Sequence, residues 1–265
     1  MRQFAAVVSI LFVPLLVHAD SSRTRQASIR RLLVSVPGDG VYLYDLQGTE
    51  LWSFRCDPYD AAEFRGGNIL VTERRAGRVF SVSRDGKIDW EWGDLEGPVN
   101  AEPLDNGNVL VVENDTGNVF EVAQDRKKMF RGMAGHRTPF DARRRSNGNV
   151  VVADSGANRI VEYDPDRTKI RETGGLKFPN SLCLLPNGRT LFTTYTNGTI
   201  GEIDEAGTLV WERRIGGTLY SVAAEGTTYW VSDGSEGRVL QVTQEGTVLR
   251  QIKLPKKFLD VAFCR

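Results

Sequence analysis

Residues 149–170 have the sequence NVVVADSGANRIVEYDPDRTKI, and their pattern indicates the fold class of this chain. An apolar run is followed by a turn rich in Asp, Ser, Gly and Asn, and then by a run in which apolar and polar residues alternate. A second turn and a last short run complete the unit. Turn residues between β-patterned runs predict hairpins. The stretch therefore predicts three antiparallel strands joined by tight turns.

The same unit recurs along the whole 265-residue chain. Its other copies cover residues 31–52, 68–92, 108–130, 189–211 and 227–249. Successive copies lie about 40 residues apart, and five of them follow one more short run, such as YDAAEF before the second copy. Four strands in about 40 residues are typical of one blade of a β-propeller.

The two ends of the repeat predict how the ring closes. The first copy has no leading run because residues 20–30 are polar, whereas the chain finishes with the run KFLDVAFCR, residues 257–265. We expect this run to become the innermost strand of the first blade, since closure removes the exposed edges of an open sheet. The chain is therefore predicted to be an all-β, six-bladed β-propeller over residues 31–265, with four-stranded blades.

Residues 1–19 have the pattern of a secretory signal peptide. A short basic start precedes an apolar run, and Val17-His18-Ala19 forms a small-residue cleavage pattern. The alternative is an uncleaved anchor, but the run is shorter than the ~20 residues that span a bilayer, and Pro14 would kink it. Residues 20–30 then form a polar lead-in. We expect a secreted or periplasmic protein without an integral membrane segment after cleavage.

Charge and cysteine content exclude several classes of protein. The 34 Lys and Arg residues balance 34 Asp and Glu, so no broad attraction to nucleic acid is expected. The short basic runs Arg143–Arg145 and Lys256-Lys257 are expected to face solvent. Three cysteines without a C-x-x-C pair exclude zinc and redox motifs. Cys183 and Cys264 lie in apolar runs, whereas a disulfide to Cys56 is left open.

A ring of polar residues is expected at one mouth of the central channel. Each inner strand begins with an oxygen-bearing side chain, and the six are Asp60, Asn100, Asp141, Asn180, Ser221 and Asp260. Carboxylate and amide oxygens around one axis suit Ca²⁺ or another divalent cation, with Asn180, Asp260, Asp141 and Asn100 as ligands. Three carboxylates in a narrow channel also need a cation or bound protons to offset their repulsion. The alternative is a polar lining of a water-filled channel.

A second ring ends the second strand of each copy. It consists of Ser35, Glu73, Glu113, Asp154, Thr194 and Asp233. Acids before a tight turn commonly accept hydrogen bonds from turn amides. Glu73 and Glu113 are longer than that role needs, which makes them candidates for the mouth. His136, in the loop before Asp141, is either a solvated side chain or a general base.

The repeat resembles that of NHL-type propellers, which the segment NGNVVVADSGANRIVEYDPD (147–166) matches closely. The segment FPNSLCLLPNGRTLFTT (178–194) is similar to one in the senescence-marker/gluconolactonase and strictosidine-synthase-like families. The gluconolactonase resemblance implies that Asn180 and Asp260 are divalent-metal ligands. The D-x-x-G-x-x-x-W endings at Asp45 and Asp204 also resemble PQQ-like and arylsulfotransferase-like repeats.

Two functions remain open from the sequence. The first is an exported propeller that binds a small ligand, a glycan or a partner protein at the channel mouth, with or without a central divalent cation. The alternative is a metal-dependent lactonase or related hydrolase of the gluconolactonase-like type. In that enzyme the metal would polarise a carbonyl, and Asp60, Glu73 or His136 would act as the base.

Overall fold

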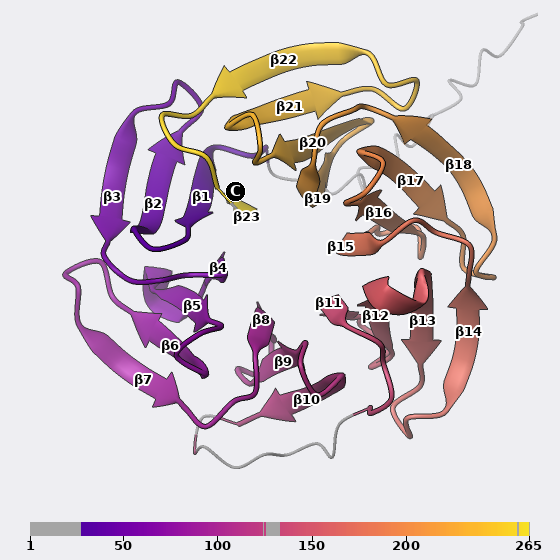
Figure 1. Ribbon diagram of the computed structural model, residues 1–265, viewed down its shortest axis with the longest axis horizontal. Coiled ribbons are helices and arrows are strands. Elements are labelled where there is room, and N and C mark those ends of the chain that lie inside the picture. The colour runs from indigo at the N-terminus through magenta and orange to yellow at the C-terminus, as the bar shows by residue number, and fades with distance from the viewer. Residues whose placement is uncertain (1–27, 124, 126–132, 259, 265) are drawn as a thin grey trace, which may run out of the picture.

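The computed structural model describes residues 28–123, 125, 133–258 and 260–264. The predicted signal peptide and most of the polar lead-in lie outside these residues. The described chain forms six antiparallel sheets arranged as blades around a central channel (Figure 1). The six-bladed propeller predicted from the repeat is therefore confirmed.

Each blade runs outward from the channel through successive antiparallel strands. The inner strands are β23 (Asp260–Cys264), β4 (Asp60–Glu63), β8 (Pro98–Pro103), β11 (Pro139–Arg144), β15 (Pro179–Leu184) and β19 (Leu219–Glu225). The second strands are β1 (Arg31–Val36), β5 (Ile69–Glu73), β9 (Val109–Glu113), β12 (Val150–Asp154), β16 (Thr190–Thr194) and β20 (Thr228–Asp233).

The third and outer strands complete the blades. The third strands are β2 (Gly40–Asp45), β6 (Arg78–Val82), β10 (Asn118–Val122), β13 (Arg159–Tyr163), β17 (Thr199–Ile203) and β21 (Arg238–Val242). The outer strands are β3 (Glu50–Phe54), β7 (Ile88–Trp92), β14 (Lys169–Thr173), β18 (Leu209–Arg214) and β22 (Val248–Lys253). In the third blade the structure describes three strands, and residues 126–132 beyond β10 lie outside the described residues.

The ring closes as the sequence predicted. The C-terminal strand β23 pairs antiparallel with β1, so that Ser35 stands opposite Asp260 and Arg31 opposite Cys264. In Figure 1 the yellow β23 lies inside the indigo strands of the first blade. This pairing joins the two ends of the described chain in one sheet and leaves no inner strand missing from it.

The middle strands are buried on both faces because neighbouring blades pack against one another. All five residues of β5 and of β9 are buried, whereas the outer strand β3 is largely exposed. Between the second and third blades, Leu70 and Val79 pack with Val111 and Phe120, each fully buried. Burial of apolar surface at about 25 cal/mol per Å² makes these interfaces the main source of stability. Among the described residues, no helix is long and apolar enough to cross a membrane.

Candidate ligand-binding site at the channel mouth

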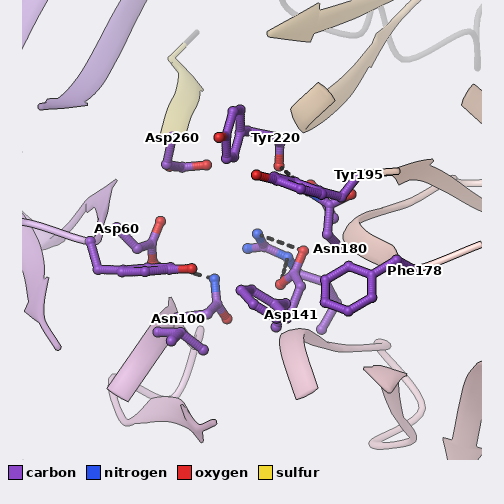
Figure 2. Close-up of a pocket in the computed structure, with 13 residues that line it drawn as sticks. Asp60, Asn100, Asp141, Phe178, Asn180, Tyr195, Tyr220 and Asp260 are labelled. Atoms are coloured by element: carbon purple, nitrogen blue, oxygen red, sulfur yellow. Dashed lines mark hydrogen bonds and ion pairs between the residues drawn. The ribbon is translucent and has the colours of Figure 1, made fainter. Parts of the chain in front are cut away.

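A cavity of about 330 Å³ opens at the mouth of the channel, where the inner strands begin (Figure 2). Its aromatic wall consists of Tyr59, Phe140, Phe178, Tyr195 and Tyr220. Its polar floor includes Asp60, Asn100, Asp141, Asn180, Ser181 and Asp260. Five of the six predicted mouth residues therefore line this cavity. The sixth, Ser221, lines a second cavity of about 410 Å³ that continues along the channel.

β-Bulges at the start of four inner strands place four side chains that line the cavity. In β8, β11, β15 and β19 the register with the second strand shifts by one residue near the mouth. The residues left without a paired neighbour are Val99, Phe140, Asn180 and Tyr220. An extra residue in one strand bends that strand and changes the direction of a side chain.

The observed pairing of β15 with β16 changes one residue of the predicted mouth ring. Ser181, not Asn180, occupies in β15 the place that Asp141 holds in β11 and Ser221 in β19. Asn180 stands at the bulge, where its Nδ2 donates to the Leu219 carbonyl at 2.9 Å. The segment has polar residues at both positions, so its sequence pattern did not distinguish them.

The ring residues brace neighbouring inner strands in pairs. Asp60 Oδ2 accepts a hydrogen bond from the Ala101 amide at 3.1 Å, and Asp141 Oδ2 accepts one from the Leu182 amide at 2.7 Å. In the same way, Ser221 Oγ accepts one from the Val261 amide at 2.9 Å. In each case the acceptor and the amide lie on successive blades. Part of the ring is therefore committed to holding the propeller closed.

An arginine supplies the positive charge at the centre of the channel. Arg143 Nε lies 3.0 Å from Asp141 Oδ1, and its guanidinium also donates to Asp141 Oδ2 at 3.3 Å. The Asp141 side chain is 4% exposed and that of Arg143 is 29% exposed. Burial raises the pKa of Asp141, and the Arg143 charge opposes that shift. The expectation that Arg143 faces solvent was wrong, because β11 turns this residue into the channel.

Two further carboxylates face each other across the floor. Asp60 and Asp260 come from neighbouring inner strands, and Ser221 Oγ donates to Asp260 Oδ1 at 2.6 Å (Figure 2). Burial, together with the charge and hydrogen bond of Asp60, raises the pKa of Asp260 well above its usual value. The guanidinium of Arg143 and the raised pKa of Asp260 both reduce the repulsion that the sequence predicted.

The second cavity contains another, half-buried acid, which the sequence did not single out. Glu102 lies two residues beyond Asn100 on β8 and lines that cavity. Burial raises the pKa of Glu102 to about 7, opposed by the charge of Arg143 and the Arg144 amide, which donates to Glu102 Oε2 at 2.8 Å. The channel therefore carries acidic side chains along much of its length.

The five aromatic rings form a continuous arc around the mouth. Ring centroids are 6.4 Å apart for Tyr59 and Phe140, 5.5 Å for Phe140 and Phe178, 5.9 Å for Phe178 and Tyr195, and 5.5 Å for Tyr195 and Tyr220. Tilted and edge-on rings at these separations attract one another. Three of the five aromatic residues directly precede a polar residue of the mouth ring in the sequence or lie at a bulge. That position is the sequence signal by which they could have been predicted.

Phe178 holds its place in the arc in an unusual backbone conformation. Its φ is +61°, in the left-handed region that a bulky side chain rarely adopts. The Phe178 amide donates to Asn158 Oδ1 at 3.0 Å, and its carbonyl accepts from the Tyr195 amide at 3.0 Å. Such strain costs about 1–3 kcal/mol and persists where the surroundings fix it, often at binding sites.

The acids of the floor are not grouped as ligands of one metal ion in this structure. The described residues contain no group of three His, Cys, Asp or Glu side chains arranged to hold one. Among the four predicted ligands, Asp141 is paired with Arg143, and Asn180 Oδ1 accepts from Thr193 at 3.3 Å. The Ca²⁺ hypothesis stays a prediction.

The acids of the second ring brace turns instead of lining the cavity. Glu73, Asp154 and Asp233 each bind the Nε of the arginine opposite them on the third strand, at 2.6, 2.8 and 3.0 Å. Each also accepts a hydrogen bond from a backbone amide of the preceding loop. Glu113 likewise accepts the Glu96 amide at 3.0 Å. This arrangement matches the turn-capping interpretation, and neither Glu73 nor Glu113 reaches the mouth cavity.

His136 and Cys56 also lie apart from the cavity. His136 is 7% exposed, with Nδ1 3.0 Å from the Gly117 carbonyl and Nε2 2.9 Å from the Tyr163 hydroxyl. Burial lowers the pKa of His136. Cys56 is a free thiol. The structure thus brings Asp60 to the floor but does not bring the other two proposed bases, Glu73 and His136, to it.

Comparison with known proteins identifies the fold. No protein-family description matches the chain, and no curated protein matches it. A protein of unknown function from Bacteroides caccae is 16% identical, with 88% of this chain and 98% of that chain covered, at a TM-score of 0.73. A catalytically inactive virginiamycin B lyase from Staphylococcus aureus, solved with quinupristin, is 13% identical, with coverage of 86% and 85% and a TM-score of 0.66.

A further structural match contains a protein partner. BBS1N in complex with ARL6DN is 10% identical to this chain, with coverage of 86% and 77% and a TM-score of 0.62. Identities this low show a shared propeller fold and nothing finer. The NHL-type and gluconolactonase resemblances stay predictions.

Proposed function

We propose that this chain is a small-molecule-binding propeller whose ligand occupies the mouth cavity. The observation that carries the proposal is the aromatic arc above a polar floor. Ligand sites are typically concave, about 300–1,000 Å³ in volume and largely apolar, with a few polar groups that orient the ligand. The cavity of about 330 Å³ meets each of these criteria.

The size of the cavity favours a small ligand over a glycan chain or a protein. A volume of about 330 Å³ corresponds to roughly ten water molecules at about 30 Å³ each. Four of the five rings are only partly exposed, so the wall offers depth instead of a flat surface. The virginiamycin B lyase structure holds quinupristin, which is a precedent for the fold and not for this ligand.

A metal-dependent lactonase stays the alternative from the sequence, and it has less support because the described residues contain no group of three His, Cys, Asp or Glu side chains that could hold a metal ion. The signal-peptide pattern of residues 1–19 supports a site of action outside the cytoplasm. Detection of the mature N-terminus by mass spectrometry in a secreted or periplasmic fraction would test this part.

A ligand-observed NMR screen of mixed fragments tests the binding proposal. Phe178→Ala and Tyr59→Leu remove parts of the wall, and the control Leu249→Ala truncates a side chain that is 55% exposed on β22. We expect hits that bind the wild-type and control proteins and weaken at least fivefold in both wall variants. Circular dichroism and melting temperature verify that each variant is folded. If the hits bind both wall variants as tightly as the wild-type protein, or if no compound binds, the proposal of a ligand in the mouth cavity is refuted.

A further inference from the structure

The floor of the mouth cavity carries more negative than positive charge. Asp60, Asp141 and Asp260 line it, and Arg143 is the only basic residue among the lining residues. The formal charge is therefore 1 − 3 = −2, and protonation of Asp260 alone would still leave an excess of one negative charge. An anionic ligand would meet like charge in a partly buried site, where repulsion is stronger than in water.

A buried acceptor in the same floor has no hydrogen-bond partner among the residues that the structure describes. Asn100 is 5% exposed, and its Oδ1 receives no hydrogen bond. The Nδ2 of Asn100 donates a hydrogen bond to Asp60 Oδ2 at 3.3 Å, so this bond identifies Oδ1 as the side-chain atom without a partner (Figure 2). A buried acceptor without a partner is costly, and a ligand N–H or O–H group would relieve that cost.

The wall is suited to a cation as well. The faces of aromatic rings carry partial negative charge and attract cations within about 6 Å of the ring centroid. Tyr59 and Phe140 stand directly beside Asp60 and Asp141 in the chain and line the same cavity. A positive group at the floor would therefore meet carboxylates, a free amide oxygen and nearby ring faces at once.

We propose that the ligand is an organic ammonium ion, with its N–H₃⁺ or N–H₂⁺ group at the floor between Asn100 Oδ1 and the carboxylates of Asp60 and Asp260, and its apolar body against the aromatic arc. This inference rests on the proposed function and defines its ligand class. A primary or secondary ammonium fits better than a quaternary one, because Asn100 Oδ1 requires a hydrogen-bond donor. The occupied site would have little net charge.

Three matched probes test the charge requirement: 2-phenylethylamine, 2-phenylethanol and 3-phenylpropanoate, measured by isothermal titration calorimetry at neutral pH. We expect the amine to bind at least tenfold more tightly than the alcohol and the carboxylate to bind most weakly. An alcohol or carboxylate that binds as tightly as the amine would overturn the inference.

Two variants at the rim place the charge effect in this cavity. Tyr195 is 42% exposed, so Tyr195→Lys adds a cation at the mouth without burying it, and Tyr195→Gln is the neutral control. Both variants lose the same ring of the arc and should weaken alcohol binding equally, whereas the lysine variant should weaken amine binding about tenfold more than the glutamine variant does. Equal effects on both probes would contradict an electrostatic origin.

The fragment screen separates the two proposals. Hits that depend on Phe178 and are mainly ammonium compounds support both. Hits that depend on Phe178 but are mainly neutral or anionic leave the binding function standing and overturn the ammonium inference. If no compound of any charge binds the mouth, both proposals fail.

Discussion

Replacing Arg143 tests whether this arginine is the built-in counter-ion of the channel. In Arg143→Met the apolar stem is kept and the guanidinium is lost, which leaves Asp141 buried at 4% exposure without its partner at 3.0 Å. Removing one member of a buried ion pair typically costs about 3–5 kcal/mol. Because Arg143 itself is 29% exposed toward the channel, we expect the lower end, about 3 kcal/mol. In a chain of this length that corresponds to a melting temperature lower by about 6–12 °C.

The measurement is urea unfolding followed by circular dichroism, with calorimetry for the melting temperature. The matched control is Arg75→Met, because Arg75 is 84% exposed and lies 3.5 Å from Asp57. Exposed ion pairs contribute about 0–1 kcal/mol, so this variant should be nearly as stable as the wild type. Asp141→Asn in the Arg143→Met background should recover part of the loss, because the uncompensated charge is then gone.

The pH dependence gives the prediction a sign. Burial already raises the pKa of Asp141, and loss of the guanidinium should raise it further. The folded variant then holds a proton that the unfolded chain releases above about pH 4, so its stability falls as the pH rises. The deficit relative to the wild type should be small near pH 4 and largest near pH 8. A deficit no larger than that of Arg75→Met, or one that does not change with pH, would refute the counter-ion role.

Three other outcomes follow from the same structure. Burial and Asp60 raise the pKa of Asp260, so the folded chain should keep a proton there that the unfolded chain loses. Urea unfolding should therefore show that Asp260→Asn becomes more stable relative to the wild type as the pH rises from 5 to 8. The exposed Asp166→Asn is the control, and parallel curves of stability against pH for Asp260→Asn and the wild type would contradict the shift. Burial raises the pKa values of Cys56 and Cys264 to about 12 each, so iodoacetamide at pH 8 should label them only after unfolding, as mass spectrometry would show. A chain ending at residue 258 lacks β23 and should lose its cooperative calorimetric transition, and an unchanged transition would argue against closure by that strand.

Most of the fold could be predicted because its signals are local and repeated. Each copy carries its own turn residues and apolar runs, and the unpaired run that contains Val261 matched the missing strand of the first blade. Val79 and Val119, which hold the same position in two successive copies, are fully buried in their blades. A period of about 40 residues identifies the architecture even where a single strand boundary is uncertain.

The site was harder to predict because it depends on register and on assembly. A one-residue bulge decides whether Asn180 or Ser181 takes the ring position, and both are polar residues in succession after Pro179. The sequence of Arg143–Arg145 resembles an exposed basic run, and only the closed ring shows that its first member lies inside the channel. Phe178 lies in the aromatic arc because its backbone is in the left-handed region, and the sequence around it does not predict that conformation.

The spacing of Asp141 and Arg143 has a consequence for how the site operates. Residues two apart on a strand point to the same side, so β11 directs both the acid and its counter-ion into the channel. The pairing is thus set within one strand, and this positive charge cannot dissociate as a metal ion can. A metal-bound floor would change its charge with the concentration of free cation, whereas this floor keeps a constant excess of negative charge at a given pH. Ligand affinity should therefore follow the charge of the ligand and stay the same when EDTA replaces millimolar Ca²⁺, and a dependence on Ca²⁺ would show that the arginine is not the cation that governs the site.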